Sequence, residues 1–233
     1  LGINGVTDDN LAAVQAALAA SADNGSGVDT KTKLQELVNA VVNPTNGTYT
    51  LALAKIKAYA DDITSALGVP SDTDYANIGV SGLSTNNGAD GKPTAEAMNT
   101  ALAEPEVQGA QADTAAAVQT LINAYAAITA AADGTADVDT NPTQAQYSAI
   151  GVNGVDSAVK ESLLGSVIDA KAFGDVDTVG EVQDLANAVA AVMSGAAGNT
   201  APTKAQLELL GINGVTADNL AAVQAADRAS TRL

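Results

Sequence analysis

The clearest hydrophobic pattern is an amphipathic stripe that occurs three times, each time shortly after an Asp-Thr pair. Apolar residues stand at positions i, i+3, i+4 and i+7, which form one face of an α-helix. The three sets are Leu34, Leu37, Val38 and Val41; Val118, Leu121, Ile122 and Tyr125; and Val182, Leu185, Ala186 and Val189. Each set carries a glutamine after its first member and an asparagine four residues later, at Gln35 and Asn39, Gln119 and Asn123, and Gln183 and Asn187. The pattern predicts three helices of one kind.

A shorter helix is predicted wherever the chain reads Pro-[Ser/Thr]-x-x-[Asp/Gln], which happens at 70–74, 142–146 and 202–206. Its N-caps would be Ser71, Thr143 and Thr203, because an Asp or Gln follows three residues later, as in a capping box. Its C-terminal glycines would be Gly79, Gly151 and Gly211 in the left-handed conformation of a Schellman motif. The next apolar residue (Val80, Val152 or Ile212) would then pack on Tyr75, Tyr147 or Leu207.

A middle helix is predicted between these two kinds. Thr7, Asp156 and Thr216 are its expected N-caps. Its apolar face would comprise Leu11, Val14 and Leu18 in one copy, and Val159, Leu163, Leu164, Val167 and Ile168 in another. In the second copy a polar stretch rich in Asn and Gly, residues 83–93, intervenes and is expected to be a surface loop. An additional helix is predicted over 49–67, with Leu53, Ile56, Ile63 and Leu67 on one side.

Internal repetition organises these helices. Residues 1–17 and 210–226 are identical except that Ala217 stands in place of Asp8, and a Gly-[Ile/Val]-x-Gly motif begins at Gly2, Gly79, Gly151 and Gly211. Together they predict an all-α protein of tandem three-helix-bundle repeats in an elongated array. The expected parts are a partial repeat at 1–43, a connector helix at 44–69, a repeat at 70–132 with the 83–93 insertion, a full repeat at 133–199, a partial repeat at 200–226 and an appended cloning tail at 227–233.

Composition narrows the function. The chain has 233 residues, 10 Lys+Arg against 27 Asp+Glu, a formal charge of −17, and neither His nor Cys. Without His and Cys there is no Ser–His or Cys–His pair and no structural zinc site of the usual kind. The acidic excess disfavours nucleic acid and anionic lipid, and the longest apolar stretches are too short to insert into a membrane. We therefore expect no enzyme activity.

Calcium is the one ion for which the sequence offers a candidate. Asp137, Asp139 and Asn141 match the first three ligands of an EF-hand loop, but Pro142 stands at the required Gly and Ser148 at the required bidentate Glu. The alternative is a solvated loop whose Asp and Asn accept hydrogen bonds from the turn backbone. We expect no other cofactor. The adjacent carboxylates Asp8-Asp9 and Asp61-Asp62 are expected at helix ends, since neighbouring helical side chains do not face each other.

Two runs carry a family resemblance. The run [Leu/Ile]-Gly-[Ile/Val]-x-Gly-Val-Thr-x-x-Asn-Leu-Ala-Ala-Val-x-Ala-Ala, followed by Val-Asp-Thr-x-x-x-[Leu/Val]-Gln-x-Leu, resembles the helical tandem repeats of very large bacterial surface proteins, RTX-type and biofilm-associated adhesins exported by type I secretion. The order of elements is also similar to the three-helix GA-type module, whose family binds albumin. The resemblance implies an extracellular, cell-surface protein with a role in adhesion and biofilms.

Two functions follow from that resemblance. In the first, the repeats form a non-enzymatic stalk or spacer that projects an adhesive domain from the cell, with neighbouring repeats as partners. In the second, the three-helix modules themselves bind a host protein or glycan. Binding surfaces are commonly rich in aromatic residues and Arg, which are scarce here, and this favours the spacer. The near-identical ends also predict head-to-tail self-association, since one end carries the helix that the other lacks.

Overall fold

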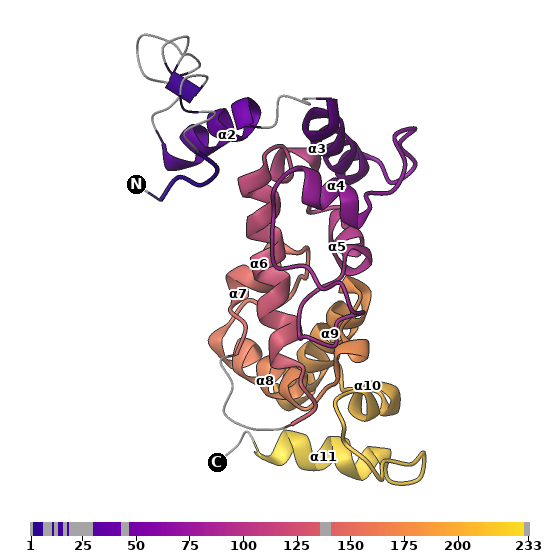
Figure 1. The fold of residues 1–233 in the computed structure, drawn as a ribbon. Helices are drawn as coiled ribbons and strands as arrows, with labels where there is room; N and C mark the ends of the chain where they lie inside the picture. Colours follow the sequence, from indigo (N-terminus) through magenta and orange to yellow (C-terminus); the bar gives the residue numbers. More distant parts are fainter. Residues whose placement is uncertain are drawn as a thin grey trace. The chain divides into compact units, whose positions relative to one another are not determined.

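The computed structural model describes residues 2–6, 11, 14, 15, 18, 30–42, 47–135 and 141–230. Over these residues the chain forms ten α-helices and two 3-10 helices, and no strand (Figure 1). The predicted all-α class is therefore confirmed. Among the described helices, none combines the length and the hydropathy needed to cross a bilayer.

The helices belong to two compact units, each discontinuous in sequence. Unit 1 comprises Leu1–Ser81 and Gln108–Thr120, and unit 2 comprises Gly82–Val107 and Leu121–Leu233. Helix α6 (Ala115–Ala131) begins in unit 1 and continues in unit 2. The boundaries of the predicted repeats remain a prediction.

Unit 1 contains α2 (Lys31–Val42), α3 (Gly47–Asp61), α4 (Asp72–Asn77) and the 3-10 helix η1 (Gly109–Gln111). Helix α3 packs on α4 and η1, with the side chains of Ile56, Tyr75 and Ile78 fully buried. The prediction of a helix reaching residue 67 is wrong, because α3 ends at Asp61 and Ile63 and Leu67 are exposed. The stop has a local cause: the Asp62 carboxylate accepts hydrogen bonds from the N–H (2.8 Å) and the hydroxyl (2.6 Å) of Thr64, and such a turn competes with the helix.

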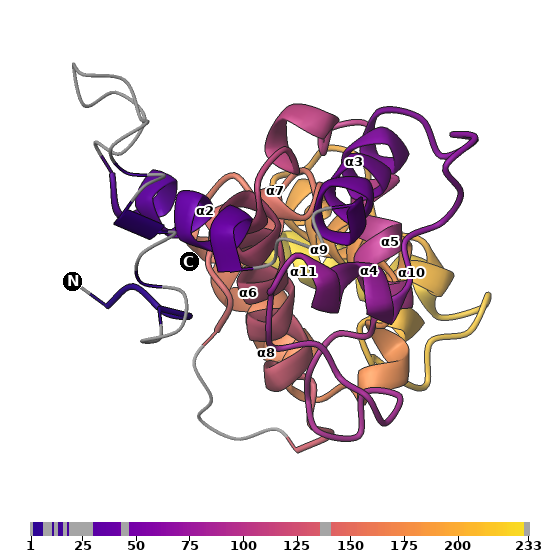
Figure 2. The ribbon, with the colours of Figure 1, turned by 45° about the horizontal axis from the view of Figure 1, so that its top comes forward.

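Unit 2 is arranged around one helix, α9 (Val179–Ala196). The others are α5 (Ala95–Leu102), α7 (Gln144–Ala149), α8 (Ala158–Asp169), η2 (Phe173–Asp175), α10 (Lys204–Leu209) and α11 (Leu220–Ser230). Helix α9 packs against α5, α8, α10 and α11 (Figures 1 and 2). Elements on either side of α9 in sequence thus share it as a common core.

The predicted stripes are largely buried. All four apolar positions of the stripes on α6 and α9 are buried, whereas on α2 Val38 is buried and Leu34 and Leu37 are only half-buried. The side chain of Val41 and the predicted N-cap Thr7 lie outside the described residues. In the middle helix Val14 is buried, Leu18 is half-buried and Leu11 is exposed.

Two details of the middle helix α8 differ from the sequence prediction. Val159 is 58% exposed, so the apolar face is narrower than predicted and centres on Leu164 and Ile168. The N-cap is Ser157 rather than Asp156, because the Ser157 hydroxyl accepts the Lys160 N–H at 3.3 Å. The Asp156 carboxylate instead forms an ion pair with the Lys160 ammonium at 2.8 Å.

The insertion 83–93 is a loop, and most of its residues are exposed, as predicted, but Ser84, Gly88 and Pro93 are buried. Ser84 is buried, and its hydroxyl accepts the N–H groups of Asn86 (3.2 Å) and Gly88 (2.9 Å). A Cβ built on Gly88 would lie 2.2 Å from the nearest ring carbon of Phe173. The loop therefore folds over its own serine and packs against the residues after α8, an arrangement that its polar composition concealed.

Candidate functional site

The feature that recurs in the structure is a glutamine clamp: a glutamine side-chain amide that bonds to both the main-chain N–H and C=O of the third residue of a Gly-x-x-Gly turn. Gln35 clamps Asn4, with both N···O distances 2.8 Å. Gln119 clamps Ser81 at 2.9 Å for both bonds. Gln183 clamps Asn153 at 2.7 and 3.2 Å. A carboxamide provides one acceptor and two donors, so it can pair with a peptide group as another peptide would.

Each clamp depends on the backbone of its turn. Both glycines of the turn have positive φ, 91° at Gly151 and 83° at Gly154, a conformation that costs other residues roughly 1–2 kcal/mol. The turn leaves the N–H and C=O of Asn153 outside any helix, where Gln183 reaches them from α9. Two glycines and one glutamine thus fix the approach of the long helix to the turn.

The asparagine one helical turn further on orients the clamp. The second N–H of the Gln35 side chain donates to Oδ1 of the Asn39 side chain at 3.0 Å. The Gln183 side chain donates in the same way to Oδ1 of Asn187 at 3.0 Å. This spacing of four residues places both side chains on one helix face. The asparagine therefore holds the amide plane ready for the turn.

The short helix before the turn is fixed at both ends. Ser71, Thr143 and Thr203 are its N-caps, each in a complete capping box. At the other end Gly151 N–H bonds to Ser148 O at 3.1 Å and Val152 N–H to Tyr147 O at 3.0 Å, the two bonds of a Schellman motif. The same pair ends α10, at 2.9 Å for Gly211 and 3.0 Å for Ile212, while Gly79 donates to Ala76 O at 3.0 Å.

A fourth turn, Gly211–Gly214, has the same backbone but a different surrounding. Both of its glycines have φ of 81°, and the Asn213 side chain donates to Gly211 O at 3.2 Å. Beside it Leu209 and Ile212 are 38% and 42% exposed, whereas Val152 at the equivalent place is 2% exposed. Among the residues that the structure describes, no glutamine bonds to the main chain of Asn213.

Unit 1 also contains a cleft of about 650 Å³, lined by residues of two clamps. Asn4, Gln35 and Glu36 contribute to its wall, as do Ser81 and Gln119. Burial raises the pKa of Glu36, the negative charge of Asp113 raises it further, and Lys33 acts in the opposite direction. One oxygen of Glu36 is buried without a hydrogen bond among the described atoms. The cleft presents the side-chain amides of Asn4, Gln35 and Gln119, the Glu36 carboxyl group and the side chain of Lys31.

The calcium candidate is only partly visible. Asp137 and Asp139 lie outside the described residues, and the Asn141 side chain packs against Gly165, where a Cβ would lie 2.4 Å from Asn141 Cγ. Nearby, hydrogen bonds from the Thr135 hydroxyl and N–H hold the pKa of Asp133 below its usual range. No cluster of three or more metal-ligating acidic residues occurs in the part of the chain that the structure describes. Calcium binding stays a prediction.

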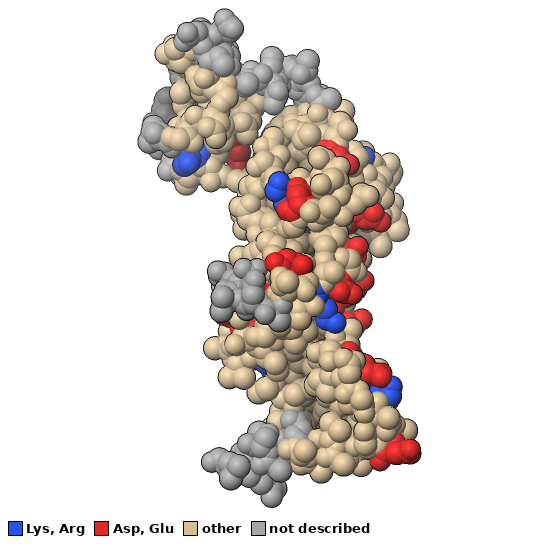
Figure 3. All heavy atoms as spheres, turned by 60° about the horizontal axis from the view of Figure 1, so that its bottom comes forward, with Lys and Arg blue, Asp and Glu red and all other residues tan. Residues whose placement is uncertain are grey.

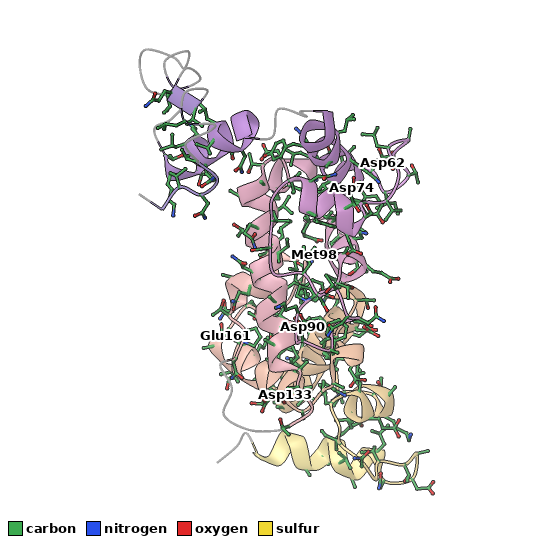
Figure 4. The ribbon with its side chains drawn as sticks, viewed as in Figure 1. Asp62, Asp74, Asp90, Met98, Asp133 and Glu161 are labelled. Atoms are coloured by element: carbon green, nitrogen blue, oxygen red, sulfur yellow. The ribbon has the colours of Figure 1, made fainter. Side chains whose placement is uncertain are left out.

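The adjacent carboxylates Asp61 and Asp62 have separate partners. Asp61 accepts the Gly109 N–H at 2.8 Å, while Asp62 closes its own turn with Thr64, so the two do not form an acid–base pair; Asp8-Asp9 lies outside the described residues. In unit 2, Asp90, Asp133 and Glu161 are spread over separate elements rather than gathered at one point (Figure 4). On the face drawn in Figure 3 acidic side chains are distributed with few cations among them.

Sequence reasoning identified the residues of the clamp but not their role. The glutamines, asparagines and Gly-x-x-Gly motifs all stand out as repeated, yet their partnership appears only in three dimensions. The usable signal was that each glutamine stripe follows one such motif. No protein-family model matches the chain, and neither a curated protein nor a solved structure matches it.

Proposed function

We propose that this chain is a non-enzymatic structural repeat region, a stalk or spacer, of a large bacterial cell-surface adhesin. The observation that carries the proposal is the glutamine clamp, which is built three times along the chain from equivalent residues. A device repeated with its geometry intact serves the assembly of the chain itself, because a binding or catalytic site needs to occur only once. The partners of each repeat are its neighbours in the array.

Packing in unit 2 supports an array. Helix α9 contacts α8, which precedes it, and α10 and α11, which follow it, so one repeat supplies the core of the next. The Lys171 ammonium adds a hydrogen bond to Leu209 O at 2.8 Å across the same junction. Stability in such arrays comes from nearest-neighbour interfaces. We propose tandem three-helix repeats in an elongated, extracellular array.

The alternative, that the modules bind a host protein or glycan, is favoured by one observation. The cleft of unit 1 offers the carboxyl group of Glu36 among amide groups of two clamps. That set of groups would suit a polar ligand with several hydrogen-bond donors. The spacer explains more of the chain, because the cleft occurs in unit 1 whereas clamps occur in both units.

Small-angle X-ray scattering on a lengthened chain tests the spacer. Because residues 210–226 repeat residues 1–17 with one change, a second segment 1–209 can be joined ahead of the full chain without a new junction. An elongated array predicts a radius of gyration that rises about 1.9-fold, in proportion to length, whereas a compact globule would rise by only about 1.3-fold. The compact value would contradict the proposal.

A further inference from the structure

The fourth turn, at which no glutamine of the described residues binds the main chain, identifies a docking surface. We infer that the turn Gly211–Gly214, with Leu209 and Ile212 beside it, binds the glutamine-bearing helix Lys31–Val42 of a second copy of this chain through Gln35. The inference needs only the clamp and holds whether or not the chain is a stalk.

The receptor, the turn Gly211–Gly214, is equivalent to the turn Gly2–Gly5, which binds Gln35. Residues 210–226 repeat residues 1–17, so Asn213 stands where Asn4 stands in the first copy. The glycines of both turns have positive φ, 65° and 90° at Gly2 and Gly5 and 81° at both Gly211 and Gly214. In the first copy this backbone receives Gln35 through two hydrogen bonds of 2.8 Å. The same helix is therefore the natural occupant of the fourth turn.

Apolar surface on the receptor points the same way. Leu209 and Ile212 are exposed next to the fourth turn, whereas the residues equivalent to Ile212 beside the three clamped turns are half-buried (Ile3 and Val80) or buried (Val152). Exposed large apolar residues that lie together are typical of an interaction surface. A helix that docks there covers both.

The donor helix α2 is only partly covered by its own chain. Leu34 and Leu37 of α2 are half-buried, whereas the equivalent residues of α6 and α9 are buried. Those two helices clamp turns that follow a short helix, α4 or α7, and the fourth turn likewise follows α10. Moving α2 to a second copy exchanges the Gln35–Asn4 pair for an equal Gln35–Asn213 pair and adds apolar cover. The exchange is therefore neutral for hydrogen bonding, and it covers Leu209 and Ile212 of the receptor.

Charge favours the same pairing. Exposed Lys31 and Lys33 lie on the first turn of α2, in a chain whose net charge is −17. The receptor region carries an exposed carboxylate at Asp218, whereas the exposed Glu208 already forms an ion pair with Lys204. Opposite charge at the rim steers association even where it adds little affinity. Because donor and receptor are different surfaces, the contact runs on as an open chain of copies.

Sedimentation velocity of the full chain over a wide concentration range, with a receptor variant, is the first test. Wild type is expected to form larger species as concentration rises. Ile212→Lys should stay monomeric. The side chain at 212 is exposed in the monomer, so the charge destabilises only the docked assembly. Val159→Lys, at an apolar site on α8 that is 58% exposed against 42% for Ile212, should associate like wild type. A monomeric wild type, or an Ile212→Lys protein that associates as wild type does, overturns the inference.

A second variant pair separates the clamp from simple apolar stacking of the chain ends. Gln35→Ala should weaken association at least tenfold, and Gln119→Ala, which removes an interior clamp, should leave it within about twofold of wild type. Circular dichroism on both variants checks that they remain helical. If Gln35→Ala associates like wild type while Ile212→Lys does not, the ends stack without the clamp and the inference is wrong. The scattering test of the spacer uses covalently joined repeats, so its outcome is independent.

Discussion

The side-chain amide of Gln183 bonds to the main chain of Asn153 through both its oxygen and its nitrogen, at 2.7 and 3.2 Å. The two residues are 30 positions apart in sequence, and their contact joins the long helix α9 to the turn that follows α7. Equivalent contacts occur at Gln35 and Gln119.

Gln183→Ala is expected to lower the free energy of unfolding by about 1–3 kcal/mol, because two hydrogen bonds to the main chain are lost. Gln144→Ala is the matched control. Among the described residues, the main-chain N–H of Gln144 donates to Glu161, and the Gln144 side chain forms no hydrogen bond. Urea denaturation followed by circular dichroism measures both. Equal stability of the two variants would show that the clamp adds nothing.

Leu121→Ala should cost roughly 2–5 kcal/mol, the usual range for truncating a buried leucine. Leu121 lies in the middle of the α6 stripe and is buried. Leu67→Ala, at a leucine that is 49% exposed, should cost well under half as much. Chemical denaturation of the pair checks the assignment, which fails if the exposed site proves the more costly.

Gly151→Ala and Gly211→Ala separate backbone strain from crowding at equivalent positions. Both glycines have positive φ, so each variant should lose about 1–2 kcal/mol to strain. A Cβ on Gly151 would lie 2.5 Å from Glu104 Cβ, whereas nothing lies within 4 Å of one on Gly211. Gly151→Ala should therefore lose a further 1–3 kcal/mol or so. Thermal and denaturant melts decide, and equal losses would refute the packing of the turn on the residues after α5.

Asp74 is expected to make stability depend on acid pH. Burial alone would raise its pKa, but the Lys55 ammonium at 2.8 Å and the Ser71 hydroxyl and N–H bring the pKa below the usual value (Figure 4). A carboxyl whose pKa is lower in the folded state stabilises the fold above the unfolded pKa of about 3.9 and loses that contribution as pH falls through the folded value.

Asp74→Asn should therefore be less stable than wild type at pH 7, and the difference should shrink between about pH 4 and pH 2. Asp72→Asn, at an exposed carboxylate on the same helix, controls for the loss of one negative charge. Denaturation at a series of pH values measures the difference. A gap between Asp74→Asn and wild type that persists unchanged at pH 2 would contradict the role given to Lys55 and Ser71.

The helices were predictable because their signals are local. The caps at Ser71, Thr143 and Thr203 and the stripes on α6 and α9 depend on residues within a few positions of each other. The errors arose where a single side chain overrode the pattern. Asp62 stops α3 before Ile63, and Ser157 takes the cap from Asp156, which pairs with Lys160 instead.

The clamp and the burial of Gly88 in the 83–93 loop were not predictable, because both depend on contacts distant in sequence. Repetition showed that the glutamines matter, but not that each would meet a peptide group some 30 residues away. The loop around Ser84 reads as polar and exposed until Phe173, far along the chain, packs on Gly88. The periodicity of apolar residues shows which face of a helix is apolar, but it does not show which other element packs on that face.

Amide hydrogen exchange, measured residue by residue by NMR at low protein concentration, tests the glutamine clamp most directly. The N–H groups of Asn4, Ser81 and Asn153 each donate to a glutamine, whereas no such bond is given for the equivalent N–H of Asn213. We predict slow exchange at the first three, fast exchange at Asn213, and loss of protection at Asn153 alone in Gln183→Ala. Equal exchange at all four amides, or protection of Asn153 that survives Gln183→Ala, would contradict the account.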